Sequence, residues 1–194
     1  YSGDPKAGDI PLDTLLSAEF AAQRRAAIDM ERAAEYPDAG PLDDHDTTYF
    51  CVADRDGNAV SFIQSIFHGF GCGVVVEGTG MLMNNRMGCF SLDPESPNYL
   101  QPGKRPIHTL NTYMIARDGK PCVVGGTPGG DVQVQTSLQV IQKLIDFGWT
   151  PQEAVEAPRW ISDEGVNITL EGRFEPEAVA ELKRRGHRVG IVPP

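Results

Sequence analysis

The chain has 194 residues and is 40% hydrophobic, which is enough for one substantial core. Its net charge of −10 argues against nucleic acid or an anionic membrane surface as the main partner, and no apolar run is long enough to span a bilayer. The four cysteines form no Cys-x-x-Cys pair, and the four histidines show no metal-ligand spacing. We therefore expect buried or half-buried free thiols, and neither a metal nor a cofactor.

The first 46 residues contain one predicted helix between two polar segments. Residues 1–10 are polar, with glycine and proline, and we expect a loop there. Residues 17–29 are rich in alanine and carry apolar residues at helical spacing, which predicts a helix. Residues 36–46 combine prolines, a glycine and several acids, so they indicate an exposed linker that ends at Thr47.

Hairpins are predicted in the middle of the chain. The first has strands at 48–54 and 59–66, joined by the turn Arg55-Asp56-Gly57-Asn58. Two further strand pairs are expected at 74–76 with 81–83, and at 111–116 with 122–125 around Asp118-Gly119.

Helices dominate the C-terminal part. We expect helices at 132–147, 151–157 and 176–185, and strands at 166–170 and 189–192, the last at a sheet edge. Gly148 and Gly186 mark the ends of the first and the last of these helices. Hairpins followed by helices indicate an α+β layered fold, in which helices cover a sheet.

Thr47, at the start of the first predicted hairpin, is the most suggestive residue chemically. A threonine hydroxyl is a poor nucleophile by itself. If the peptide bond before Thr47 is cut, its own α-amine becomes a base within reach of the hydroxyl, which is the N-terminal threonine form of a nucleophile–base pair. That amine titrates near pH ~8, which suits proton transfer near neutral pH. The alternative is an ordinary threonine at a strand edge.

Four motifs bear on this choice. They are Thr47-Thr48 followed by Asp54-Arg55-Asp56-Gly57-Asn58-Ala59-Val60-Ser61; Gly69-Phe70-Gly71 followed by Asn84-Asn85-Arg86-Met87; Pro102-Gly103-Lys104-Arg105-Pro106; and Gly126-Thr127-Pro128-Gly129-Gly130 followed by Ala157-Pro158-Arg159. Each alone has a plain alternative, such as a turn at Asn84-Asn85 or Gly129-Gly130, or a solvated loop around Lys104-Arg105. In this order and spacing, the chain from 47 to 159 resembles the catalytic small subunit of the γ-glutamyltranspeptidase family of N-terminal-nucleophile hydrolases.

The resemblance implies a four-layer αββα sandwich made from a self-cleaved precursor. Cleavage would fall between Asp46 and Thr47 and leave Thr47 as the nucleophile. Ser65 stands at the family's position for a hydroxyl that orients this nucleophile, and Gly129 and Gly130 fall on the family's oxyanion hole. Physical chemistry agrees with the last assignment, because consecutive glycines let backbone N–H groups face a developing oxyanion, and the helix that follows adds its positive end.

The chain departs from the family where γ-glutamyl enzymes hold the amino-acid head of the substrate. Phe67 stands where the family has an asparagine, Arg86 where it has a glutamine, and Cys89 where an aspartate grips the α-amino group. His108 and Thr109 replace two serines that help to bind the α-carboxylate. Acceptors for an ammonium group are lost and a guanidinium is gained, which favours an anionic ligand. The alternatives are a structural ion pair for Arg86 and a core position for His108.

The segment 91–101 is short where some members of the family carry a longer lid. A short segment indicates an open pocket, as in the branch of cephalosporin-acylase-like enzymes and oxamate amidohydrolases. The run Asn84-Asn85-Arg86, together with Pro106-Ile107-His108-Thr109-Leu110, resembles that branch more than the true transpeptidases.

Together these features predict an amide hydrolase, self-processed before Thr47, that forms an acyl-enzyme with a carboxylate-bearing amide such as oxamate. Residues 1–46 would be the C-terminal tail of the large subunit, and residues 47–194 the small catalytic subunit, incomplete at its C-terminus. The expected partners are that large subunit, from the same precursor, and the small-molecule amide, while a higher oligomer stays open.

Two other functions remain as alternatives. One is a γ-glutamyltransferase or glutathione hydrolase, and the other is a non-catalytic relative that binds without cleaving. The compartment is also open: no signal peptide is visible and the scattered cysteines slightly favour the cytoplasm, with the periplasm or secretion as alternatives.

Overall fold

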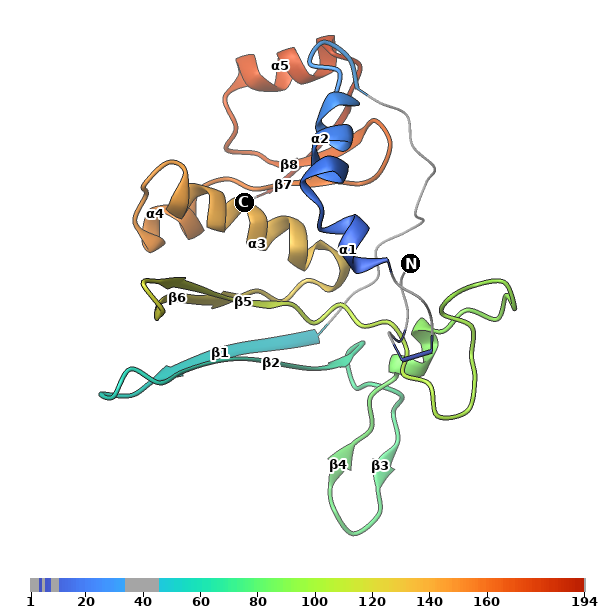
Figure 1. Cartoon of the computed structure of the whole chain (residues 1–194). Helices are drawn as coiled ribbons and strands as arrows, with labels where there is room; N and C mark the ends of the chain where they lie inside the picture. Colours follow the sequence, from blue (N-terminus) through green and yellow to red (C-terminus); the bar gives the residue numbers. More distant parts are fainter. Residues whose placement is uncertain (1–3, 5, 8–10, 34–45, 194) are drawn as a thin grey trace. The chain divides into compact units, whose positions relative to one another are not determined.

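The computed structural model describes residues 4, 6–7, 11–33 and 46–193, which fall into two compact units (Figure 1). The first unit contains Tyr1–Ile10 and Leu42–Ser137, and the second contains Pro11–Pro41 and Leu138–Pro194. The predicted linker 36–46, except for its last residue, lies outside the described residues, as does most of the predicted loop 1–10. The predicted division into a large-subunit tail (1–46) and a small subunit (47–194) stays a prediction. It depends on cleavage of the bond between residues 46 and 47, which the two compact units do not test.

Antiparallel hairpins build the first unit and confirm the three that the sequence predicts. The strands are β1 (Asp46–Ala53), β2 (Ala59–Phe67), β3 (Val75–Val76), β4 (Met81–Leu82), β5 (Thr112–Arg117) and β6 (Lys120–Gly126). The turn between β5 and β6 has Asp118 and Gly119 at φ 52° and 76°, in the left-handed region that these two residue types tolerate well.

The two long hairpins, β1–β2 and β5–β6, pack against each other through aromatic rings and glycines. Between the hairpins, a Cβ atom added at Gly126 would lie 2.5 Å from the Tyr49 ring. Within the β5–β6 hairpin, one added at Gly125 would lie 2.2 Å from the ring of Tyr113, its cross-strand partner. These positions are therefore glycine because the rings cross them closely. The Ser61 hydroxyl lies 3.0 Å from the Tyr49 hydroxyl. It also lies 3.3 Å from the carbonyl oxygens of Tyr113 and Gly125, so one side chain links both hairpins.

The second unit combines a three-stranded sheet with helices. Its elements are α1 (Leu12–Leu15), α2 (Ala18–Ala26), α4 (Pro151–Glu156), β7 (Trp160–Ser162), β8 (Asn167–Glu171), α5 (Pro176–Arg184) and β9 (Arg188–Val192). Helix α3 (Gln133–Ile145) contains residues of both units. Strand β8 is central, antiparallel to β7 and parallel to β9, and α5 connects the parallel pair. The predicted edge position of the last strand is confirmed.

The predicted helices are confirmed with slightly shorter ends. Helix α2 begins after Ser17, whose Oγ accepts the Phe20 N–H at 3.0 Å, and α4 begins with a capping box between Thr150 and Glu153. The short elements α1, β7, η1 (Arg86–Cys89) and η2 (Gly130–Val132) are not predicted, because three or four residues carry too little periodicity. No helix within the described ranges is long and apolar enough to cross a membrane.

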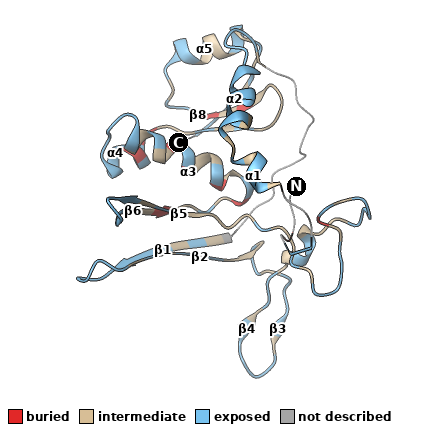
Figure 2. Ribbon diagram, viewed as in Figure 1, coloured by how far each residue is buried: buried red, intermediate tan, exposed pale blue. Residues whose placement is uncertain are grey.

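Few residues of either unit are fully buried (Figure 2), and the apolar ones among them are unevenly distributed. The buried apolar residues of the described chain all belong to the second unit; they are Ala154, Ala157, Ile168 and Leu170. In the first unit, one face of the β1–β2 hairpin is apolar and exposed; this outer hairpin face consists of Phe50 (44% exposed), Val52 (59%), Val60 (51%) and Phe62 (46%). Two of its rings stack with centroids 4.9 Å apart. A contiguous apolar strand face of this kind normally packs against another layer.

Helix α5 ends in a cluster of ion pairs around Glu181. Arg184 and then Arg185 donate to its carboxylate at distances of 2.6 to 2.7 Å, and these bonds lower its pKa from 4.5 to about 2. An acid whose pKa is depressed in the folded state adds stability above its unfolded pKa, and this contribution is lost as the pH falls through the folded pKa. The fold should therefore lose stability as the pH falls from about 4.5 to about 2.

We expect Glu181→Gln to remove this part of the pH dependence. In thermal unfolding followed by circular dichroism, the melting temperature of the wild type should fall more steeply than that of the variant between pH 4.5 and pH 2. The difference should be small, because water screens exposed ion pairs. Glu177→Gln is the control, since Glu177 lies on the same helix without an ion-pair partner among the described residues. Parallel curves for the wild type and Glu181→Gln would contradict the prediction.

Candidate active site

The predicted nucleophile lies at an irregularity of the β1–β2 ladder. Thr47 on β1 pairs with Ser65 on β2, whereas Asp46 pairs with Phe67, so the register shifts between Asp46 and Thr47. Such bulges often re-aim a side chain near a functional site. The Thr47 Oγ1 atom is buried and has no hydrogen-bond partner among the described residues. An unpaired buried hydroxyl costs about 1–3 kcal/mol, which makes Thr47 a candidate for a functional role.

Phe67 has an unusual backbone conformation, with φ at 78°. A bulky residue in this region is strained by about 1–3 kcal/mol, so the surroundings must hold it there. Its N–H donates to Ser65 Oγ at 2.9 Å. Its ring stacks on the His68 ring with centroids 4.4 Å apart, and the Arg86 guanidinium carbon lies 4.2 Å from its centroid.

Arg86, the first residue of η1, is held by its neighbours and keeps one donor available. Its Nη1 donates to Thr109 Oγ1 at 3.2 Å, and its backbone N–H donates to Asn84 Oδ1 at 2.9 Å. Its Nη2 is buried and has no partner among the described residues. No carboxylate of the described chain pairs with Arg86, so the alternative of a structural ion pair finds no support there. The structure thus brings together Phe67, Arg86 and Thr109.

The Asn84-Asn85 pair orients this arginine, a role that the sequence analysis did not assign. Asn85 Oδ1 accepts the His68 N–H at 3.0 Å, and the Asn85 N–H donates to the Ile66 carbonyl at 3.2 Å. These two bonds fasten the end of β2 to the turn that precedes Arg86.

The segment from Cys89 to His108 is tied by a buried asparagine. Asn98, only 8% exposed, donates from Nδ2 to the Cys89 carbonyl at 2.6 Å and accepts the Ile107 N–H on Oδ1 at 3.1 Å. Cys89 is a half-buried free thiol, as expected, but the expectation of burial is wrong for the other free thiols, which are exposed: Cys51, Cys72 and Cys122. His108 is exposed, so the alternative of a buried core histidine is wrong: the chain runs past it on the surface of the unit.

Gly129 and Gly130 lie in the loop between β6 and η2, at φ 126° and 54°. The first value is open essentially only to glycine. Gly130 is buried, and neither N–H donates to another described residue. The short helix η2 and helix α3 begin directly behind them, and the role of these N–H groups as an oxyanion hole stays a prediction.

Packing of the hairpins brings this loop toward the start of β1. The ring of Tyr49 lies against Gly126, the last residue of β6, and the turns of both long hairpins lie at the opposite end (Figure 1). Gln133, fully buried at the start of α3, accepts the Asn111 N–H on Oε1 at 3.0 Å. This bond ties the chain just after Thr109 to the helix behind the glycines. Sequence reasoning missed Gln133, because one polar residue in an amphipathic helix carries no distinctive signal.

Two arginines of the sequence motifs have structural partners. Arg105 pairs with the buried carboxylate of Asp4 at 3.0 Å, and its hydrogen bonds hold the pKa of that carboxyl well below its usual range. Arg159 pairs with Glu171 on β8 at 2.9 Å, within the second unit. The loop around Arg105 is therefore held by an ion pair, which the alternative of a plain solvated loop does not include.

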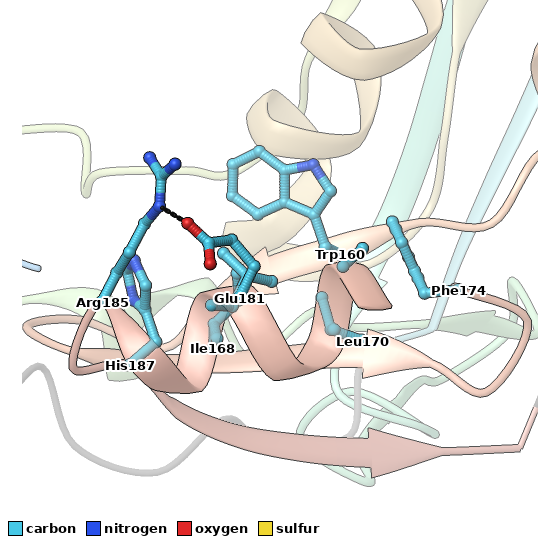
Figure 3. A pocket seen from close by; sticks show the side chains of 9 residues that line it. Trp160, Ile168, Leu170, Phe174, Glu181, Arg185 and His187 are labelled. Carbon is cyan, nitrogen blue, oxygen red and sulfur yellow. Dashed lines mark hydrogen bonds and ion pairs between the residues drawn. The ribbon is translucent and has the colours of Figure 1, made fainter. Parts of the chain in front are cut away.

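A cavity of about 500 Å³ lies in the second unit between α5 and its sheet (Figure 3). Its lining is mostly apolar, with the Glu181–Arg185 ion pair at one side. The lining residues are Trp160, Ile168, Leu170, Phe174, Ala178, Glu181, Leu182, Arg185 and His187. None of them is a predicted site residue. Within the described ranges, no group of three or more His, Cys, Asp or Glu side chains could hold a metal ion.

Comparisons with known proteins identify the family of the chain. The family model of gamma-glutamyltranspeptidase matches residues 1–193. The glutathione hydrolase-like YwrD proenzyme of Bacillus subtilis (strain 168) is 41% identical over 97% of the chain, and the oxamate amidohydrolase proenzyme of Klebsiella pneumoniae is 38% identical over 97%. The chain spans 36% of the length of each of these relatives.

A solved structure gives the fold. The cephalosporin acylase from Bacillus halodurans is 41% identical, with a TM-score of 0.90 over 100% of the chain and 35% of its own length. The described chain accordingly has the fold of the N-terminal-nucleophile hydrolases. Within that class, it belongs to the γ-glutamyltranspeptidase family.

Proposed function

We propose that the complete protein is an amide hydrolase that is cleaved by itself before Thr47 and then uses Thr47 as an N-terminal nucleophile. Its preferred substrates carry a carboxylate next to the scissile amide, as oxamate does. The observation that carries the proposal is the buried Nη2 donor of Arg86, which has no partner among the described residues and belongs to the same unit as Thr47 and Ser65.

Self-processing would use the same hydroxyl as catalysis. Thr47 Oγ1 attacks the Asp46 carbonyl carbon, the C–N bond breaks, and the hydroxyl proton passes to the departing amine. Water then hydrolyses the ester, which leaves a carboxylate on Asp46 and a free α-amine on Thr47. The register shift at the Asp46–Thr47 step and the buried, unpaired Thr47 hydroxyl support this step.

Catalysis would follow the same sequence with an external amide. The Thr47 hydroxyl attacks the amide carbonyl while the α-amine takes its proton, and the N–H groups of Gly129 and Gly130 stabilise the oxyanion. The amine returns the proton to the leaving nitrogen, which departs as ammonia or an amine. Water activated by the same α-amine then releases the acyl group. Ser65, which lies opposite Thr47 in the ladder, would orient the nucleophile once the chain is cut.

Charge and geometry at Arg86 would select the substrate. Nη1 of Arg86 already donates to Thr109, and the Phe67 ring covers the guanidinium. The buried Nη2 can still donate to one small carboxylate. A cationic α-amino group finds no aspartate at position 89, where this chain has a cysteine. The pocket therefore fits an anion better than the amino-acid head of a γ-glutamyl group.

The names of relatives support two candidate substrates. The oxamate amidohydrolase proenzyme favours a short monoamide, whereas the glutathione hydrolase-like proenzyme keeps a γ-glutamyl substrate as the second candidate. We place the first ahead because of Arg86 and Cys89. Both relatives are proenzymes nearly three times as long as the matched region, which supports a large subunit from the same precursor as the partner. We propose a four-layer αββα sandwich for the whole protein, in which elements of the large subunit would cover the outer hairpin face.

A direct assay tests the proposal. In the full-length protein, mass spectrometry should find a fragment that begins at Thr47. The protein should release ammonia from oxamate at least about tenfold more efficiently than it releases p-nitroaniline from γ-glutamyl-p-nitroanilide, because only oxamate offers Arg86 a carboxylate without an adjacent ammonium group. An uncut Asp46–Thr47 bond in folded protein would overturn both enzymatic candidates. The opposite substrate order would favour the γ-glutamyl one.

A further inference from the structure

We propose that Phe67 is a positioning residue that links the guanidinium of Arg86 to the bond cleaved before Thr47. The inference rests on the proposed function and goes beyond it. It assigns two separable tasks to one residue: the Phe67 backbone sets the geometry at Thr47, and the Phe67 ring sets the geometry of the anion site.

The backbone task follows from the register of the hairpin. Phe67 lies opposite Asp46, where the ladder slips by one residue just before Thr47. Its φ of 78° departs from the extended conformation, and this departure ends the regular pairing of β2. The Phe67 N–H turns back onto Ser65 Oγ at 2.9 Å and so occupies one acceptor site of the hydroxyl of Ser65, the residue opposite Thr47 in the ladder.

The ring task follows from its contact with the guanidinium. The Arg86 guanidinium carbon lies 4.2 Å from the centroid of the Phe67 ring, within the range of a cation–π contact. Thr109 holds Nη1, so ring and hydroxyl together fix the orientation in which the buried Nη2 is offered. The bonds from Asn85 to Ile66 and His68 keep the turn of Phe67 beside that of Arg86.

Three variants of the full-length precursor separate the two tasks. Phe67→Gly keeps access to the left-handed backbone and removes the ring, Phe67→Ala removes the ring and keeps the strain, and Phe67→Tyr keeps both ring and backbone. Self-cleavage is timed by gel electrophoresis. The values of kcat and KM are then measured on oxamate and on its neutral isostere oxamide, and circular dichroism checks that each variant folds.

We expect Phe67→Gly to cleave itself about tenfold faster than Phe67→Ala, because glycine adopts this φ without strain. Both should lose about tenfold of the preference for oxamate over oxamide, mainly through KM, and Phe67→Tyr should retain it. Phe70 supplies the matched control, since it also has a positive φ (61°) and is 80% exposed. Its glycine and alanine variants should cleave at similar rates.

The outcomes are distinct. Equal cleavage rates for the Phe67 glycine and alanine variants, or the same difference in the Phe70 pair, would overturn the backbone task. An unchanged oxamate preference in both Phe67→Gly and Phe67→Ala would overturn the ring task. If Phe67→Ala does not fold, the comparison of Phe67→Gly with Phe67→Tyr takes its place. Failure of the proposed function is read from the wild type alone, as no cleavage before Thr47 or equal turnover of oxamate and oxamide, and it overturns the inference as well.

Discussion

The Thr47→Ala variant of the full-length precursor is expected to remain a single uncut chain and to lose amide hydrolysis by at least about 10³-fold. Alanine removes the hydroxyl that we propose attacks the Asp46 carbonyl, so the α-amine base is never released. Both the nucleophile and its base are therefore lost through one substitution. Gel electrophoresis with mass spectrometry measures the cleavage, and ammonia release from oxamate measures the turnover.

Two further variants make the result specific to the hydroxyl. Thr47→Ser keeps an Oγ atom and should still cleave, more slowly, because serine lacks the methyl group that restricts χ1. Thr48→Ala changes the next residue, which is exposed, and should cleave and turn over substrate like the wild type. Cleavage of Thr47→Ala at the normal rate would show that another group attacks the bond, and the nucleophile would have to be sought elsewhere.

Local signals explain why most of the fold can be predicted. The hairpin at Asp118-Gly119 can be predicted because its turn needs residues that tolerate a positive φ, and because a strand-like segment flanks it on each side. Both properties belong to a few consecutive residues. The end of α3 is readable for a similar reason, since Gly148 adopts φ 67° just beyond it. Strand β7 is missed because three residues between Pro158 and the following turn carry no period of their own.

The residues at the candidate site are readable only in part. Motif spacing picks out Thr47, Arg86 and Thr109, and the structure has the last two in contact at 3.2 Å. Motif spacing does not predict that Phe67 adopts a left-handed backbone conformation, because phenylalanine avoids that region unless neighbours compensate. Nor does it reveal Gln133, whose role depends on a hydrogen bond to a residue 22 positions away. Long-range contacts of this kind leave no local pattern.

Arg86→Gln is expected to lower kcat/KM for oxamate by about 10²-fold and to change turnover of oxamide by less than about threefold. Glutamine removes the positive charge and the fork of donors, while the neutral substrate never used that charge. The loss should appear mainly in KM if the carboxylate is bound equally in the ground state and the transition state. Ammonia release at several substrate concentrations gives both constants.

The controls separate charge from shape and from general damage. Arg86→Lys keeps the charge but not the planar fork, so its loss on oxamate should be intermediate, about tenfold. Arg55→Gln removes an arginine from the exposed β1–β2 turn and should leave both substrates unaffected. Equal losses on oxamate and oxamide in Arg86→Gln would assign Arg86 a structural role beside Phe67. No loss on either would mean that the carboxylate binds elsewhere, because a buried donor of this kind cannot hold an anion and leave its affinity unchanged when the charge is removed.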